Sequence, residues 1–385
     1  MIKPKTPERG SRAEPKAQKP AGVAGAAVPP EPVPALARVA PLFRKIDWLA
    51  LVITFVVVWT VYFFTLAPEL TLEDSGELVT GSFYAGIPHP PGYPVWAIYS
   101  WLWTELVPWG NMAWRVALGE AFLGALAAGL VSLIVSRGGS MFMESIEELK
   151  EMKGSWESAI CLVSGIVAGL LMGLDGFMWK ESVAVNRIAV TSVPSFLVVL
   201  VCLMRWLYAP HQYRFLFWAL FIFGICFTTH QSLLVAALGI EVAIAAVNPR
   251  LGRDAFFGNF VIWALSMLYY LVTDHHIFAN LGKPAMLVIF DGVGLASLAV
   301  SIWLTIRTKT KGIEVGRNLV FLGALACLEL MVLRTDQPGT SHFFGLVGFA
   351  GIAFFAYLAW KSWSFSREWV VVIIMGALWI LGASF

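Results

Sequence analysis

Residues 48–67 read WLALVITFVVVWTVYFFTLA, and no charged side chain interrupts these twenty positions. An α-helix needs about 20 consecutive apolar residues to cross the hydrocarbon core of a bilayer. Runs of similar character recur along the 385 residues, with approximate ends at 48–67, 114–136, 158–178, 190–208, 214–229, 231–248, 256–273, 285–306, 318–333, 342–360 and 368–385. The sequence therefore predicts an all-α, polytopic membrane protein of about eleven transmembrane helices.

The composition excludes a soluble domain of ordinary type. Hydrophobic residues make up 58% of the chain and charged residues only 14%, whereas soluble domains carry about 25% charged residues. Residues 1–46 are rich in Pro, Ala, Lys and Arg and predict a disordered basic tail, followed by a transmembrane domain over 47–385. The sequence holds no P-loop or dinucleotide-binding glycine pattern, and we expect no nucleic-acid partner.

Lysine and arginine are distributed unevenly between the loops. With the N-terminal tail in the cytoplasm, alternation through eleven spans puts 22 of the 27 Lys and Arg residues on the cytoplasmic side, as the positive-inside rule requires. The run 93–109 is interrupted by Glu105 and Pro108, so we predict a short interfacial helix there and not a span. Residues 68–113 then form the first outer loop. The last run reaches Phe385, so either the chain ends on the outer side or a longer protein is truncated there.

The first outer loop begins PELTLEDSGELVTGSFYAGIPHPPGYP over residues 68–94 and concentrates acidic side chains. Four carboxylates fall within nine positions: Glu69, Glu73, Asp74 and Glu77. A helix starting near Asp74 would place Asp74 and Glu77 on one side, and Asp74 suits the N-cap position, where a side-chain oxygen accepts from backbone N–H groups. The alternative to a catalytic site is a helix cap followed by a solvated acidic turn.

Proline and glycine dominate the next nine residues. Residues 86–94 contain four prolines and two glycines around His89. Proline fixes φ and glycine permits conformations closed to other residues, so the sequence predicts a rigid loop that presents His89 beside the carboxylates. The alternative is a tight connection between two helices, which has no need of a histidine.

The motifs DSGE (74–77) and GIPHPPG (86–92) resemble the signature of the protein O-mannosyltransferase-like membrane family, which belongs to the GT-C glycosyltransferase superfamily. The stretches GFMWKE (176–181) and GICFTTHQSLL (224–234) are similar to two further family segments. The resemblance covers about residues 48–250 and is strongest in the first outer loop.

This resemblance implies a GT-C-like fold and a membrane glycosyltransferase. Such enzymes carry a catalytic acidic residue in the first outer loop and take a sugar, here mannose-like, from a polyprenyl-phosphate donor to a protein or glycan acceptor on the non-cytoplasmic face. By position, Asp74 matches that residue, with Glu77 as its neighbour. A carboxylate can take the proton of the attacking acceptor hydroxyl.

Release of a lipid phosphate requires positive charge close to the leaving group. Arg115, Lys180 and Arg187 are candidates, because few cations occur on the outer side; the alternative is that each extends toward the lipid headgroups. We also assign His89, Glu181 and His230 to substrate binding, although His230 could instead hydrogen-bond within the protein at a helix break. We assign no metal ligands, and the need for a divalent cation stays open.

One position departs from the family pattern. Where family members usually carry an acidic residue, this chain has Asn186, with Glu181 nearby as a replacement. This departure keeps open a non-catalytic structural or assembly subunit, and a secondary transporter is a further alternative. Glu120 lies within a predicted span, where a carboxylate is costly enough to indicate function unless helix packing or protonation explains it. We expect an integral protein of a bacterial inner membrane, with its N-terminus in the cytoplasm as the charge distribution indicates.

Overall fold

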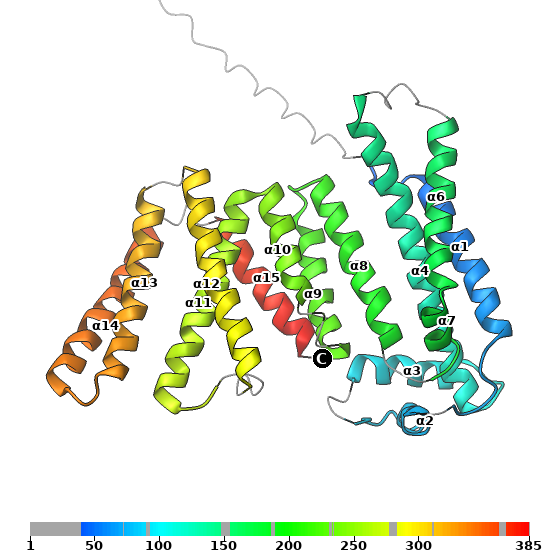
Figure 1. Ribbon diagram of the computed structural model, residues 1–385, viewed down its shortest axis with the longest axis horizontal. Coiled ribbons are helices and arrows are strands. Elements are labelled where there is room, and N and C mark those ends of the chain that lie inside the picture. Colours follow the sequence, from blue (N-terminus) through cyan, green and yellow to red (C-terminus); the bar gives the residue numbers. More distant parts are fainter. Residues whose placement is uncertain are drawn as a thin grey trace, which may run out of the picture. The chain divides into compact units, whose positions relative to one another are not determined.

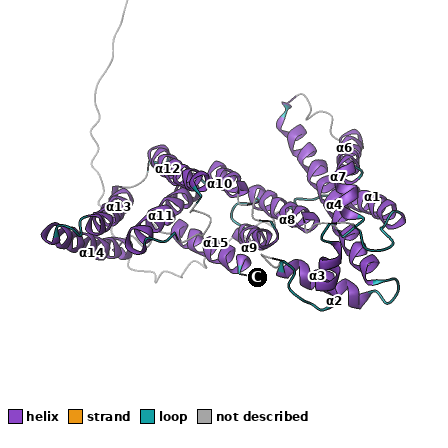
Figure 2. Cartoon of the chain, turned by 60° about the horizontal axis from the view of Figure 1, so that its bottom comes forward, coloured by secondary structure: helices purple, strands orange, loops and turns teal. Residues whose placement is uncertain are grey.

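The computed structural model describes residues 40–71, 73–89, 93–147, 155–185, 189–230, 233, 235–276, 283–309, 312–361 and 367–384 (Figure 1). These residues form helices and no strand (Figure 2). The helices are α1 (Lys45–Phe64), α2 (Ser75–Phe83), α3 (Pro94–Leu106), α4 (Met112–Ser145), α6 (Ser155–Gly173), α7 (Gly176–Ser182), α8 (Ala189–Tyr208), α9 (Tyr213–Thr229), α10 (Ala236–Val247), α11 (Pro249–Thr273), α12 (Pro284–Arg307), α13 (Gly312–Leu333), α14 (Pro338–Lys361) and α15 (Arg367–Ala383).

Every predicted apolar run contains a helix. Eight helices are long and apolar enough to cross a membrane, namely α1, α4, α6, α8, α11, α12, α13 and α14. Three shorter apolar helices, α9, α10 and α15, account for the remaining runs. The prediction of an all-α, polytopic membrane protein is therefore confirmed. Helix α10 is shorter than its run: its 12 residues extend about 18 Å, less than the ~30 Å hydrocarbon core.

The loop predicted to be the first outer one, residues 68–113, folds into two short helices. The run 93–109 contains α3, whose 13 residues extend about 20 Å. Figure 1 shows α3 lying beside α2, across one end of the bundle formed by α1, α4 and α6. The structure thus agrees with the predicted short helix of the loop and not with a further span.

Three glycines spaced four residues apart allow α6 to approach α4 closely. A Cβ atom at Gly165 would lie 2.7 Å from the carbonyl oxygen of Ser132, and one at Gly169 would lie 2.6 Å from the carbonyl oxygen of Ala128. Gly173 continues the stripe and packs against both α1 and α4. Small residues at this spacing are typical of helix contacts in lipid, where close backbone approach replaces the hydrophobic driving force.

The last helix returns to the middle of the molecule. Helix α15 packs against α9 and α11, whereas α14 packs on α13. Gly224 of α9 and Gly382 of α15 make this contact possible, because a Cβ atom at Gly224 would collide with the carbonyl oxygen of Trp379. The apolar runs alone give no indication of this pairing.

We expect Gly169→Ala to destabilise the protein by about 1–3 kcal/mol, since the added methyl group forces α6 away from α4. The matched control is Gly138→Ala in α4, where a Cβ atom meets nothing within 4 Å. Thermal unfolding of both variants in the same detergent measures the difference. Equal melting temperatures would show that the α4–α6 contact is looser than described.

Candidate active site

Helices α2 and α3 are fixed to the first turns of α4 by a shared apolar cluster. Its buried members are Leu78 and Val79 of α2, Trp96 and Ala97 of α3, Ala113, Val116 and Ala117 of α4, and Val185 from the segment after α7. The Ser82 hydroxyl of α2 also donates to the Ser100 hydroxyl of α3 at 2.8 Å. Burial of each large side chain contributes roughly 1.5–3 kcal/mol, so the loop helices have a defined position on the bundle.

Glu120 anchors α3 to α4. The indole Nε1 of Trp96 donates to Glu120 Oε1 at 2.5 Å, and the Tyr99 hydroxyl donates to the carbonyl oxygen of Gly119 at 2.8 Å. Burial, and secondarily the nearby Glu120, raise the pKa of Tyr99 above its ordinary value, which keeps the hydroxyl protonated as a donor. The structure therefore supports the helix-packing alternative for Glu120.

Asp74 occupies the N-cap position of α2, as the sequence predicts. Its backbone carbonyl oxygen accepts from the N–H of Leu78 at 2.9 Å, but the expected side-chain cap is not formed among the described residues. A local hydrogen bond from the Thr71 N–H to Ser75 Oγ, at 3.2 Å, stabilises the turn into the helix. The carboxylate of Asp74 is exposed and so lies open to a ligand.

Glu77 and His89 are brought together across twelve residues of chain. Glu77 Oε1 accepts from the backbone N–H of His89 at 2.6 Å, and Glu77 Oε2 lies 3.2 Å from His89 Nδ1. In a capping box a glutamate at this helix position accepts from the backbone of the N-cap residue; here it binds the proline-rich segment instead. The predicted presentation of His89 beside the carboxylates is thus observed, with Glu77 as its partner.

The His89 ring packs against the ring of Tyr93. The two rings meet edge to face with centroids 5.7 Å apart. Tyr93 has φ 44°, in the left-handed region, which non-glycine residues rarely adopt. Pro94 follows as the first residue of α3, a position that suits its fixed φ. Residues 90–92, which carry the other prolines of the predicted rigid loop, lie outside the described residues.

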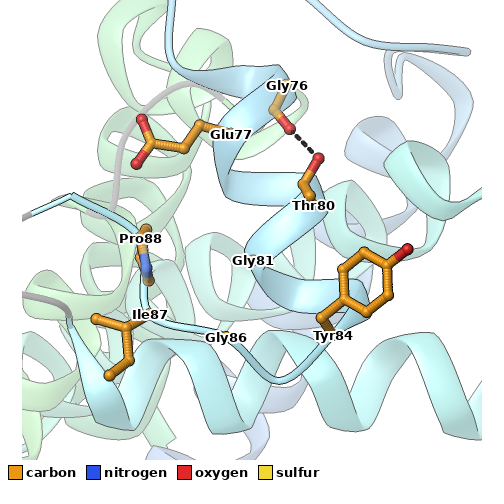
Figure 3. Close-up of a pocket in the computed structure, with 8 residues that line it drawn as sticks. All are labelled: Gly76, Glu77, Thr80, Gly81, Tyr84, Gly86, Ile87 and Pro88. Carbon is orange, nitrogen blue, oxygen red and sulfur yellow. Dashed lines mark hydrogen bonds between the residues drawn. The ribbon is translucent and has the colours of Figure 1, made fainter.

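A shallow pocket of about 470 Å³ lies between α2 and the segment that follows it. Its lining residues are Gly76, Glu77, Thr80, Gly81, Tyr84, Gly86, Ile87 and Pro88. Figure 3 shows Glu77 and Tyr84 reaching out from the helix, with Ile87 and Pro88 on the facing segment. Thr80 is turned back on the helix, because its hydroxyl donates to the carbonyl oxygen of Gly76 at 2.7 Å.

Thr80, Tyr84 and Ile87 were not among the predicted site residues. The spacing of Gly76, Thr80 and Tyr84, four apart, defines one face of a helix and could have identified that face once Ser75 was taken as its first residue. Ile87 has no comparable signal, because it reaches the pocket only through the turn after α2.

The predicted cations have different surroundings. The Arg115 guanidinium donates to the carbonyl oxygens of Thr104, Trp109 and Gly110 at 3.0–3.2 Å, so it closes the end of α3 onto the start of α4. Lys180 is exposed on α7. Arg187 lies outside the described residues.

Glu181 is the buried acidic residue of α7, with only 4% of its surface exposed. Its Oε2 has no hydrogen-bond partner among the described residues. Helix α7 lies beside the exit of α1, because the Ala67 N–H donates to the carbonyl oxygen of Val183 at 2.8 Å and the Trp179 indole donates to Thr65 Oγ1 at 2.9 Å. Glu181 is thus held near the root of the first outer loop.

The remaining predicted residues are distributed around this region. His230 follows the last residue of α9 and is exposed, and α9 contacts α3. Asn186 lies outside the described residues. Within the part of the chain that is described, no group of three or more His, Cys, Asp or Glu side chains is arranged to hold a metal ion. Among the described residues, Glu77 and His89 are a pair of predicted site residues linked by a hydrogen bond, and Asp74 lies one helical turn from Glu77.

Comparison with known proteins gives a consistent result for this region. The chain is 30% identical to the mouse (Mus musculus) protein O-mannosyl-transferase TMEM260 over 152 residues, which cover 38% of this chain and 22% of that protein. It is 25% identical to the Dictyostelium discoideum protein O-mannosyl-transferase tmem260 over 96 residues, or 24% of this chain and 12% of that protein. The chain thus spans less than a quarter of either relative. No solved structure matches it, so the GT-C-like fold stays a prediction.

The family model for the protein O-mannosyl-transferase TMEM260 N-terminal domain matches residues 74–250. That match begins at Asp74 and includes Glu77, His89, α7 and the end of α9, which are the segments on which the predicted resemblance rests. The resemblance to an O-mannosyl-transferase-like membrane family is therefore confirmed for residues 74–250, which are similar to the N-terminal domain of these proteins.

Proposed function

We propose that this protein is a membrane glycosyltransferase that moves a mannose-like sugar from a polyprenyl-phosphate donor to a protein or glycan acceptor on the non-cytoplasmic face. The observation that carries the proposal is the exposed carboxylate of Asp74, which is engaged in no hydrogen bond with the described residues. It lies at the start of α2, next to a pocket lined by Glu77. The names of the two relatives support transfer of mannose.

Asp74 acts as the general base in this proposal. The acceptor hydroxyl oxygen attacks the anomeric carbon of the sugar, and its proton passes to the Asp74 carboxylate. The bond between the anomeric carbon and the phosphate oxygen breaks, and the lipid phosphate leaves with that electron pair. A base in this role contributes typically 10²–10⁴-fold to the rate.

Glu77 has a positioning role, because both of its oxygens already face His89. Its hydrogen bond to the His89 backbone fixes the segment that forms the facing wall of the pocket. His89 keeps its second ring nitrogen, Nε2, for a substrate hydroxyl or phosphate oxygen.

Positive charge for the leaving phosphate comes from Lys180 and Arg187 in this proposal. Lys180 is exposed on α7, beside the root of the loop. Arg115 stabilises the connection between α3 and α4 in this proposal, since its N–H groups donate to backbone carbonyl oxygens there. Glu181 and His230 bind substrate from α7 and from the end of α9.

We expect Asp74→Asn to lower the transfer rate by about 10²–10⁴-fold while leaving the melting temperature unchanged, because the side chain makes no hydrogen bond that the fold requires. Purified protein in proteoliposomes, supplied with polyprenyl-phosphate mannose and an acceptor, measures the rate. Glu69→Gln is the matched control, since Glu69 is an exposed carboxylate of the same loop.

Full turnover by Asp74→Asn would reject Asp74 as the base. Wild-type protein that folds and binds the donor but transfers no sugar would favour a structural or assembly subunit. Solute uptake by sealed vesicles, without sugar transfer, would favour a secondary transporter.

For Glu77 we expect a graded series. Glu77→Ala removes the acceptor of the exposed His89 N–H, which costs about 0.5–1.5 kcal/mol and lowers kcat/KM roughly two- to tenfold. Glu77→Gln keeps an oxygen acceptor for that N–H and recovers most of the activity. If Gln were as inactive as Ala, the charge of Glu77 would matter in the reaction itself, and Glu77 would be more than a positioning residue.

A further inference from the structure

Three arginines and two aromatic rings alternate at one end of α4, α8 and α9. The guanidinium carbons of Arg137 and Arg205 lie 5.8 and 5.6 Å from the centre of the Tyr208 ring. Arg205 also lies 4.9 Å from the Phe215 ring, and Arg214 lies 4.8 Å from that ring. We call these five side chains the arginine ladder.

The ladder carries more positive than negative charge. Arg137 Nη1 lies 3.4 Å from Glu144 and donates to the Ser140 hydroxyl at 2.5 Å. Arg205 Nη2 donates to Gln212, which is neutral, at 3.1 Å. Guanidinium groups that share aromatic rings repel one another, and a single carboxylate balances only part of their charge.

Two N–H groups of the ladder are buried without an acceptor among the described residues. They are Arg137 Nε and Arg205 Nη1, and Arg137 has only 5% of its surface exposed. A buried donor left unsatisfied costs about 1–3 kcal/mol, and more when it is charged. An acceptor is thus missing among the described residues, and a bound anion would supply one and also offset the charge.

The ladder lies at the end of the bundle away from α2 and α3. Arg137 follows Ala113, which packs against the loop helices, by 24 positions along the continuous helix α4, which corresponds to about 36 Å. That length exceeds the ~30 Å hydrocarbon core of a bilayer. Figure 1 shows the turn between α8 and α9 at the opposite end from α2 and α3. The ladder is therefore at the level of the lipid headgroups in the opposite leaflet.

We propose that the arginine ladder binds the phosphate of an anionic phospholipid headgroup in that leaflet. An arginine guanidinium group can donate two parallel hydrogen bonds to two oxygens of one phosphate. Arginine also keeps its charge when partly buried. Because the ladder joins α4 to α8 and α9, the bound headgroup holds these three helices together, at the end of α4 opposite to the one that contacts α2 and α3.

The test uses the full chain, purified in a neutral detergent and titrated with phosphatidylglycerol or phosphatidylcholine, with bound lipid read by native mass spectrometry. Wild-type protein is expected to retain phosphatidylglycerol preferentially. Arg205→Gln and Arg137→Gln each weaken its binding about fivefold, the contribution of one arginine near an anionic surface. Arg205→Lys, which keeps the charge, gives an intermediate loss and shows that the effect is not misfolding.

Arg307→Gln is the control. This arginine is exposed and stacks on a single ring, that of Trp303, at 5.2 Å, on the side of the membrane where the predicted topology also places the ladder. Equal retention of the two lipids, or an equal loss in Arg307→Gln and Arg205→Gln, would overturn the proposal. Competition by inorganic phosphate at the same concentration would instead assign the site to a free phosphate ion and reject the lipid.

Discussion

The close packing of small residues along α4 is the constraint on which the other helices depend. Lipid tails are as apolar as leucine side chains, so helices in a bilayer gain little from burying apolar surface against each other. Gly129 of α4 instead lets the α1 backbone approach closely, and Gly169 of α6 lies against the carbonyl oxygen of Ala128 in α4. Helix α4 also contacts α2, α3, α7 and α8. The loop helices α2 and α3 and the arginine ladder are therefore both positioned by the same 34-residue helix.

Much of the fold is predictable because the bilayer restricts what an apolar run can do. A run of about 20 apolar residues has to satisfy its backbone hydrogen bonds internally, and a helix does so. All eleven runs and the short helix over 93–109 follow from that rule and from the length of each run. The helix start at Asp74 is also predictable, although its side-chain cap is not formed among the described residues. The partners of the helices do not follow, because the glycines that pair α9 with α15 acquire meaning only once both helices are placed.

The candidate site is likewise predictable only in part from the sequence. The sequence predicts Asp74 as the first catalytic carboxylate and Glu77 as its neighbour, and the structure gives the two residues different surroundings. Glu77 is committed to His89, whereas Asp74 is open. This difference depends on where the chain turns after Tyr84, which local sequence does not encode. Arg115 shows the converse: the scarcity of cations in this part of the sequence predicts a ligand site, whereas its N–H groups donate to the carbonyl oxygens of Thr104 in α3 and of Trp109 and Gly110 after it.

The glycine at position 76 has a consequence for how such a site can diversify. Gly76 lines the pocket, and a Cβ atom there would meet nothing within 4 Å. Most side chains could occupy the position without disturbing the bundle, and alanine would even favour the helix. Substitutions at position 76 can therefore change the shape of the pocket without changing the packing of the helices. Pocket shape and folding stability are separable traits at this position, so one can evolve without loss of the other.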